Sequence, residues 1–173
     1  MKPLISMGII AGMVWGTTFT SPQIKPNSPI PKGQVYYSCG GDNISPMFQW
    51  DKLPKKVKFV SVVVWDPDAP KPGGWYHWLL LNIPAKRKGI PLGAGNPTNP
   101  FFNIGKELKN DFGELGYGGP CPPPGKPHRY LFKLYLQKEA ITPPKNGKPA
   151  DVEKIIKEKS IGVVSIVGIY GRK

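Results

Sequence analysis

The chain has two histidines, and histidine is the side chain that titrates closest to neutral pH. His77 lies in the segment Trp75–Trp78, and His128 opens a segment that continues with Tyr130; both segments have the composition of β-strands. Side chains alternate along a strand, so His128 and Tyr130 are expected on a shared face. A charged imidazole donates hydrogen bonds to anionic oxygen. Because both histidines stand at strand ends beside loops rich in glycine and proline, they could bind an anion, and either could equally be a core histidine with internal partners.

Two carboxylates stand at positions i and i+2 directly after the apolar segment 57–65. They are Asp66 and Asp68, and Pro67 and Pro70 restrict the backbone around them. A carboxylate that faces an imidazole orients the ring and raises its pKa, which would keep the ring protonated as a donor to an anion. The same residue types could instead bind a metal, or the aspartates could accept hydrogen bonds from free backbone N–H groups in a turn.

A third unusual segment, 117–125, consists almost entirely of glycine and proline around one cysteine. It has few side chains to pack, so its backbone amides could line a shallow pocket, although the composition also suits a rigid linker. The chain has no GxSxG, HExxH or P-loop motif and no GxGxxG after a strand. Ser45 and Ser61 lie in no nucleophile motif. The sequence therefore favours binding over catalysis.

The composition predicts one mainly β domain. The chain has 173 residues, of which 21 are glycine and 22 are proline, and both residue types interrupt helices. A hydrophobic fraction of 39% is sufficient for a packed core. The formal net charge is +13, which favours anionic partners. The lysines are dispersed and no nucleic-acid-binding motif is present, so a sequence-specific nucleic-acid partner is not expected.

Hydrophobic patterning predicts the main elements of the domain. The segment 75–83 is expected to alternate so that Trp75, His77, Leu79 and Leu81 share one face. A helix is expected over 151–159 with its N-cap near Ala150 or Asp151, and a long structured loop region over 84–127. The predicted strands are 34–38, 47–50, 57–65, 75–83, 129–137 and 161–170.

The first 16 residues have the pattern of a secretory signal peptide. Lys2 precedes an apolar stretch from Leu4 to Trp15, which is too short to span a bilayer comfortably. Small residues near the end of the stretch place the expected cleavage after Gly16. An N-terminal element retained in the mature domain and an uncleaved anchor are the alternatives. Residues 1–16 are thus expected to be a signal peptide and residues 17–173 the domain, in a protein that is exported to the periplasm or secreted.

The chain has two cysteines, Cys39 and Cys121. In an oxidising compartment they could form one disulfide across a long loop, and they could equally be small core residues. There is no CxxC motif, so neither a redox motif nor a cysteine zinc site is indicated.

Several motifs occur together in this chain and in one order. The main ones are Asp66-Pro67-Asp68-Ala69-Pro70, Trp75-x-His77-Trp78, Gly119-Pro120-Cys121-Pro122-Pro123 and His128-Arg129-Tyr130. In this combination they resemble the phosphatidylethanolamine-binding protein family. The segments 19–22, 43–46, 82–85 and 168–172 are similar to the bacterial and archaeal Raf-kinase-inhibitor-like branch of that family. The chain therefore resembles this family from about residue 18 to residue 172.

This resemblance implies a β-sandwich with a large antiparallel sheet and long ordered loops, to which the sequence adds one short helix near the C-terminus. It also implies a small cavity that binds phosphate-like anions, including phospholipid headgroups, and in which the aspartates hold the imidazoles. The residues expected at the cavity by motif position are Asp66, Asp68, Ala69, Pro70, Trp75, His77, Gly119, Pro120, His128 and Tyr130.

The first functional hypothesis is non-enzymatic binding of a small anion, with no cofactor and no metal. The second is a protein-interaction module, such as a protease inhibitor, whose partner is another protein; the chain could also form a homodimer. The third is a hydrolase that uses the histidines and aspartates, and the lack of a nucleophile motif argues against it.

Overall fold

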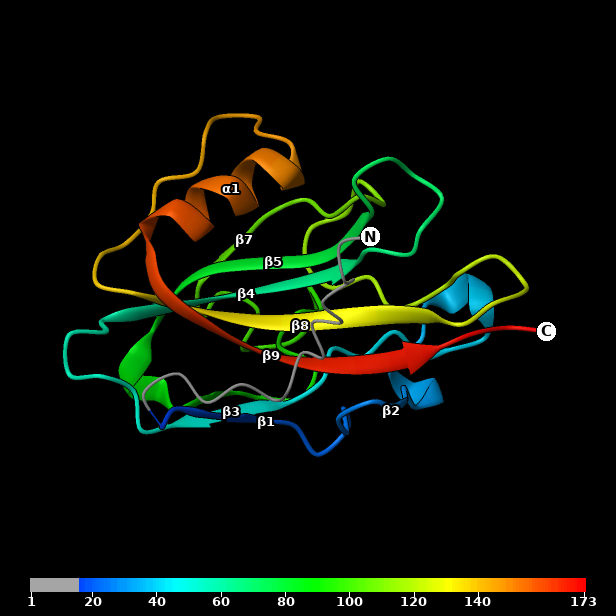
Figure 1. The fold of residues 1–173 in the computed structure, drawn as a ribbon, viewed down its shortest axis with the longest axis horizontal. Helices are drawn as coiled ribbons and strands as arrows, with labels where there is room; N and C mark the ends of the chain where they lie inside the picture. Colours follow the sequence, from blue (N-terminus) through cyan, green and yellow to red (C-terminus); the bar gives the residue numbers. More distant parts are fainter. Residues whose placement is uncertain (1–15) are drawn as a thin grey trace, which may run out of the picture.

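Two β-sheets packed face to face form the layers of the fold in the computed structural model, which describes residues 16–173 (Figure 1). The small sheet has the strand order β1-β3-β6, and the large sheet has the order β2-β9-β8-β4-β5-β7. The β-sandwich expected from the sequence is therefore confirmed. The strands are β1 (Thr18–Thr20), β2 (Ser28–Pro29), β3 (Phe48–Asp51), β4 (Phe59–Asp66), β5 (Trp75–Pro84), β6 (Gly89–Ile90), β7 (Lys106–Glu107), β8 (His128–Gln137) and β9 (Ser160–Tyr170).

The centre of the large sheet is formed by the long strands β4, β5, β8 and β9, all of which the hydrophobic patterning predicts. Strand β4 pairs with β5 on one side and with β8 on the other, so its valine-rich run is covered on both edges. The pairing of β2 with β9 is parallel. The large sheet was expected to be antiparallel, but it is mixed at this edge. The chain after β1 runs parallel to β9 only over the two residues of β2.

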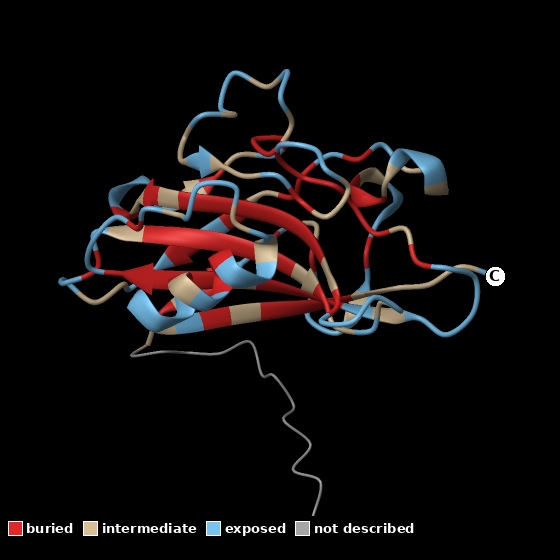
Figure 2. Ribbon diagram, turned by 90° about the horizontal axis from the view of Figure 1, so that it is seen from above, coloured by how far each residue is buried: buried red, intermediate tan, exposed pale blue. Residues whose placement is uncertain are grey.

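Two separate cores lie on the two faces of the large sheet. The larger core fills the space between the sheets and includes Trp50, Trp78 and Phe132. The smaller core lies between the large sheet and the helix α1 (Pro149–Lys159) and includes Val63 and Ile156. Figure 2 shows the buried residues concentrated in the long strands, while the connecting loops are largely exposed. The strands β4, β5 and β8 are therefore largely buried on both faces, while β9 is partly exposed, and together they form the frame for the loops at their ends.

The helix α1 forms where the sequence predicts it, but it begins earlier. Its N-cap is Lys148 rather than Ala150 or Asp151, because Pro149 occupies the first turn, where its missing N–H and fixed φ are compatible with a helix. Val152 and Ile156, four residues apart, are buried against the large sheet.

A buried acid attaches α1 to the sheet. Glu153 accepts hydrogen bonds from Tyr76 Oη at 2.5 Å and Tyr135 Oη at 2.7 Å, and it forms an ion pair with Lys133 at 2.6 Å. Burial by itself would raise the pKa of Glu153, but the Lys133 ammonium and the hydrogen bonds from its partners lower it below the ordinary value. The helix is thus held to β5 and β8 by an ionised carboxylate.

The segment 34–38 is not a strand, contrary to the sequence-based prediction. It contributes to two short 3₁₀ helices, Lys32–Gln34 and Tyr37–Cys39. The backbone N–H groups of Gln34 and Cys39 donate to carbonyls three residues earlier, as in a 3₁₀ helix, while the Tyr36 N–H donates to the distant Pro120 carbonyl, so the segment forms no strand ladder. The segment 84–127 is mainly loop, as expected, and includes a 3₁₀ turn (Ala85–Arg87) and the short strands β6 and β7.

Residues 1–15 lie outside the described part of the chain, and the predicted signal peptide falls almost entirely within them. Among residues 16–173, no helix has the length and apolar character needed to cross a bilayer.

A candidate anion-binding cavity

A cavity of about 240 Å³ opens where β4, β5 and β8 meet the loops that follow and precede them. Seven of the ten residues expected at the site line it, and these are Asp66, Ala69, Pro70, Trp75, His77, His128 and Tyr130. Phe112, Cys121, Pro122 and Pro123 complete the lining. Asp68, Gly119 and Pro120, which were also expected there, are not among the lining residues: Asp68 lies outside the cavity, and Gly119 and Pro120 belong to the segment that reaches the lining at Cys121.

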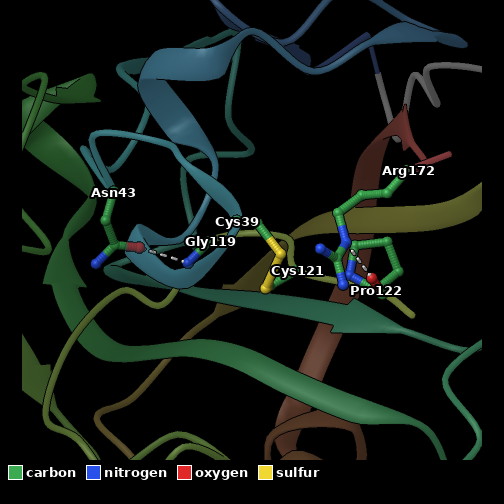
Figure 3. Close-up of a disulfide and its surroundings, with 6 residues drawn as sticks. All are labelled: Cys39, Asn43, Gly119, Cys121, Pro122 and Arg172. Carbon is green, nitrogen blue, oxygen red and sulfur yellow. Dashed lines mark hydrogen bonds between the residues drawn. A yellow bond between two sulfur atoms is a disulfide. The ribbon is translucent and has the colours of Figure 1, made fainter. Parts of the chain in front are cut away.

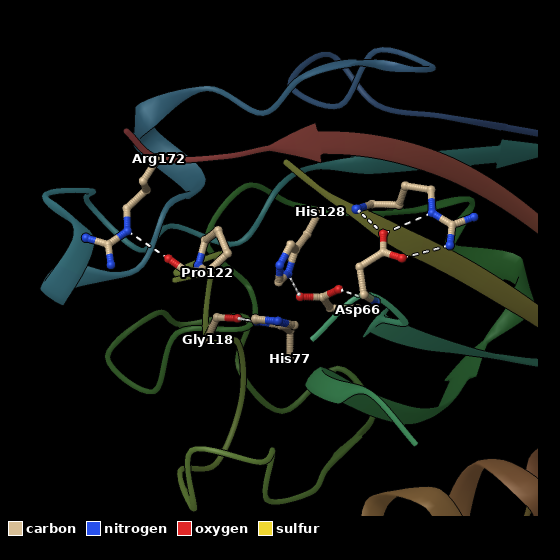
Figure 4. Close-up of polar contacts among 8 residues, drawn as sticks. Asp66, His77, Gly118, Pro122, His128 and Arg172 are labelled. Atoms are coloured by element: carbon tan, nitrogen blue, oxygen red, sulfur yellow. Dashed lines mark hydrogen bonds and ion pairs between the residues drawn. The ribbon is translucent and has the colours of Figure 1, made fainter. Parts of the chain in front are cut away.

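His128 is held by Asp66 across the β4–β8 pair. The Nδ1–H of His128 donates to Asp66 Oδ2 at 2.7 Å, while Asp66 Oδ1 accepts from the backbone N–H of Asp68 at 2.8 Å (Figure 4). Asp66 is only 2% exposed. Both carboxylate oxygens are therefore occupied, and the imidazole is oriented with its Nε2 edge directed away from the carboxylate.

A β-bulge decides the position of His77. Val64 pairs with Trp78 and the next residue of β4, Trp65, pairs with Tyr76, so His77 is the extra residue of β5. His77 and Tyr130 make an edge-to-face ring contact at 5.2 Å on the side of the larger core. The strict alternation predicted for 75–83 is therefore wrong: Leu79 and Leu81 belong to the smaller core, on the opposite face of the sheet.

His77 is bound by a backbone carbonyl and not by an aspartate, contrary to expectation. Its Nδ1 lies 2.7 Å from the carbonyl oxygen of Gly118, and the Gly118 N–H donates back to the His77 carbonyl at 2.9 Å (Figure 4). Burial lowers the pKa of His77 to about 4, and the nearby carbonyls and Asp66 only partly oppose this effect. His77 is therefore neutral at neutral pH, not the protonated donor expected from the sequence.

Two buried donors at the cavity have no partner within residues 16–173. They are the phenol Oη of Tyr130 and the indole Nε1 of Trp75. Burial and the neighbouring Asp66 raise the pKa of Tyr130 above its ordinary value, so the phenol keeps its proton. A buried polar group without a partner costs free energy, and a bound acceptor would remove that cost.

Asp68 organises the start of β8 from outside the cavity. It accepts hydrogen bonds from the backbone N–H of Arg129 at 2.8 Å and from the guanidinium Nε and Nη2 of the same residue. The side-chain hydrogen bond from Arg129 lowers the pKa of Asp68 to about 2, so it remains ionised. Asp68 thus fixes the residue that follows His128 and does not face the cavity itself.

The wall formed by 119–123 is anchored residue by residue to distant parts of the chain (Figures 3 and 4). The Gly119 N–H donates to Asn43 Oδ1 at 2.7 Å, and the Pro120 carbonyl accepts from the Tyr36 N–H at 3.0 Å. A Cβ on Gly119 would lie 2.1 Å from a backbone oxygen, so only glycine fits there. The segment is thus a pocket wall and not a linker.

Two further contacts complete this wall. Cys121 forms a disulfide with Cys39, which resolves the pairing that the sequence left open. The Arg172 Nε donates to the carbonyl of Pro122 at 2.8 Å, so the C-terminal segment also holds the wall. The unusual composition of 117–125 marked these residues as a group, but no local signal linked them to residue 39 or 172.

Phe112 is the lining residue that no sequence pattern indicated. It lies in the loop after β7, stacks on Tyr36 with ring centroids 4.2 Å apart, and contacts the edges of Trp75 and His77. It closes the apolar side of the cavity next to the neutral imidazole. Within residues 16–173, no group of three or more His, Cys, Asp or Glu residues is arranged to hold a metal ion.

Comparison with known proteins identifies the family. The family model described as phosphatidylethanolamine-binding protein matches residues 20–171. The chain belongs to this family. The match covers every residue that lines the cavity.

Family members of known structure share the fold. The crystal structure of Escherichia coli YbcL, described as a new member of the mammalian family of phosphatidylethanolamine-binding proteins, superposes with a TM-score of 0.85 at 35% identity, and the match covers 91% of this chain and 99% of that one. The homologue CT736 from Chlamydia trachomatis has a TM-score of 0.75 at 26% identity over 91% of this chain and 98% of its own.

Sequence relatives extend across bacteria and archaea. The UPF0098 protein YbcL of Escherichia coli is 35% identical over 98% of both chains, and YbhB of the same organism is 33% identical over 87% of this chain and 97% of its own. A relative from Mycobacterium tuberculosis, LppC, is named as a candidate lipoprotein. Members of the family are in general non-catalytic binding proteins for small ligands, including phospholipid-like headgroups.

Proposed function

We propose that this cavity binds a small phosphate-like anion, either free or as the headgroup of a phospholipid, and that it does so without chemical conversion. The observation that carries the proposal is the set of unpaired polar groups at one cavity: the Oη of Tyr130 and the Nε1 of Trp75 are buried donors without partners. The Nε2 atoms of His77 and His128 also make no hydrogen bond within residues 16–173.

The charges around the cavity are consistent with an anionic ligand. Asp66, the only acid among the described residues that line the cavity, accepts hydrogen bonds from His128 and from a backbone N–H, so both of its oxygens already have donors and do not compete with a ligand for the unpaired donors of the cavity. The chain as a whole carries a formal charge of +13, which favours the approach of anions. The lining has no serine or threonine, and its one cysteine is in the disulfide, so the usual hydroxyl and thiol nucleophiles are missing from it.

The test is a titration of residues 17–173 with inorganic phosphate and, separately, with phosphoethanolamine, followed by the histidine ring signals in NMR spectra. We expect the ring signals of both His77 and His128 to shift in a saturable way, with chloride at the same ionic strength as the control. The two ligands distinguish a free anion from a headgroup. Silent imidazoles in both titrations would contradict the proposal.

A protein partner is the second candidate, and the exposed apolar side chains favour it. Tyr37 is 62% exposed, and Leu115 and Phe101 are about half exposed. Such a partner, a protease for example, would bind these loops and not the cavity. A complex whose affinity does not change when a cavity residue is substituted would support this second function.

We also propose that the protein is exported and that residues 1–16 are removed. A disulfide is stable in an oxidising compartment, and a relative is named as a candidate lipoprotein. Thr17 is fully buried and its hydroxyl donates to the Lys52 carbonyl, so cleavage before Thr17 is expected to precede folding. The intact mass of the protein recovered from its producing cells should match residues 17–173; a mass that includes residues 1–16 would contradict this proposal.

A further inference from the structure

The protonation state of His77 has a consequence for which anions can enter the cavity. A carbonyl oxygen can only accept, so the hydrogen bond at 2.7 Å to Gly118 requires the proton of the ring to be on Nδ1. The ring also makes edge-to-face contacts with Phe112 and Tyr130. The Nε2 atom is therefore left as a hydrogen-bond acceptor at a cavity otherwise suited to anions.

The described surroundings of His77 favour its neutral state. The titratable groups around it are Asp66 at the end of β4, His128 and Tyr130 on β8, and Asp111 in the loop after β7. Asp111 is in turn paired with Lys71 at 2.8 Å. Charging the ring is opposed mainly by burial, which lowers the pKa of His77 to about 4. A ligand that binds only when the His77 ring is protonated would therefore bind about a thousandfold more weakly at pH 7 than its affinity for the protonated ring.

We propose that His77 makes the cavity selective for oxyanions that carry a hydroxyl group, such as hydrogen phosphate and phosphomonoester monoanions, over sulfate and phosphodiesters. The phosphate of an intact phospholipid is a phosphodiester without a P–OH group, so of the two ligand sources named above this inference selects the free anion. This inference rests on the proposed function of the same cavity. A P–OH group donates to Nε2, while a bare anionic oxygen at that position faces a lone pair and leaves the acceptor unsatisfied. Sites built to pair with a hydroxyl discriminate strongly against analogues that lack it. The structure thus assigns His77 a role in specificity, distinct from that of His128.

The decisive comparison is between phosphate and sulfate, which are similar in size and geometry. At pH 7 inorganic phosphate always retains at least one P–OH, whereas sulfate has no proton. We expect calorimetric titration of residues 17–173 at constant ionic strength to give at least about tenfold tighter binding of phosphate. Equal binding of the two anions, within about twofold, would overturn the inference but leave the anion cavity standing. If neither anion binds, the proposed function and the inference both fail.

Two substitutions separate the roles of the imidazoles. In His77→Asn the amide can still donate to the Gly118 carbonyl, but the acceptor at the Nε2 position is lost, so the ratio of phosphate to sulfate affinity should fall toward one. The matched variant His128→Asn should weaken both anions and keep their ratio. A ratio that survives in His77→Asn would overturn the inference.

A pH series on the wild-type chain tests the same point without a variant. The second pKa of a phosphomonoester is about 6, so methyl phosphate gains its P–OH as the pH falls from 7.5 to 5.5. We expect the ratio of its affinity to that of sulfate to rise by about tenfold or more over this range. The ratio is used because any general change in the charge of the protein over this range affects both anions. A constant ratio would overturn the inference.

Discussion

Replacing His128 by alanine is expected to lower the affinity of the cavity for inorganic phosphate by about a hundredfold or more. Two effects combine. The ligand loses an imidazole hydrogen bond, and Asp66, whose Oδ2 accepts from His128 Nδ1 at 2.7 Å, is left as an unpaired carboxylate next to the anion. Calorimetric titration with phosphate at pH 6.5 measures the loss. Affinity within a few fold of the wild type would mean that the anion binds elsewhere.

The matched control for this variant is Lys126→Ala. Lys126 is exposed, lies two residues before His128, and is not part of the cavity lining. The control removes a nearby positive charge, so it measures the general electrostatic contribution alone, which is expected to change the affinity by less than about twofold at physiological salt. Far-UV circular dichroism should show that both variants keep the β-sandwich, because Asp66 retains its hydrogen bond from the Asp68 N–H.

Removing the disulfide is expected to have the largest effect on stability. Cys39 and Cys121 are 82 positions apart, and a bond that closes a loop of this length restricts the unfolded chain strongly. On the loop-entropy model, the double variant Cys39→Ser/Cys121→Ser should lose about 4 kcal/mol of unfolding free energy. For a domain of this size, the midpoint of thermal unfolding should fall by about 12 °C. Urea unfolding followed by tryptophan fluorescence provides the measurement.

A reducing agent supplies the control for the disulfide prediction. Unfolding of the wild-type chain should move toward that of the double variant when dithiothreitol is present, and the double variant itself should not respond to it. If the wild-type chain and the double variant unfold at the same urea concentration in the absence of dithiothreitol, the bond does not stabilise the domain. The hydrogen bonds that hold Gly119 and Pro120 to the neighbouring loop would then be sufficient to keep the wall in place.

Local patterns in the sequence determined much of the frame. The valine-rich run that became β4, the aromatic run of β5 and the alternating run of β8 were predicted with ends within about two residues of those observed. Such runs are informative because β-branched and aromatic side chains fit a strand that is buried on both faces. The motif order also identified the family and seven of the residues that line the cavity. These are all properties that a short stretch of chain carries by itself.

The chemistry of the cavity was decided by the tertiary structure. Whether a histidine is charged depends on what surrounds it, and the two imidazoles differ for that reason: Asp66, 62 positions away in sequence, holds His128, while the bulge at His77 turns its ring into a buried position where a carbonyl holds it. The family resemblance implied that the aspartates hold both rings, and this fails at His77 because the Gly118 carbonyl occupies its Nδ1. The predicted alternation of 75–83 failed separately, because alternation assumes a regular strand. A bulge depends on the pairing of two strands, which neither strand encodes alone.

The contacts that hold the wall of the cavity likewise could not be predicted from local sequence patterns. Its residues stand out by composition, yet the partner of Cys121 and the contact from Arg172 come from segments far away in the chain, and no pattern marked the nearby Phe112. The sequence by itself therefore determined the family, the central strands and the residue types available to bind an anion. Only the folded chain decided which of those residues face the cavity and which protons they carry, because burial and long-range hydrogen bonds set both.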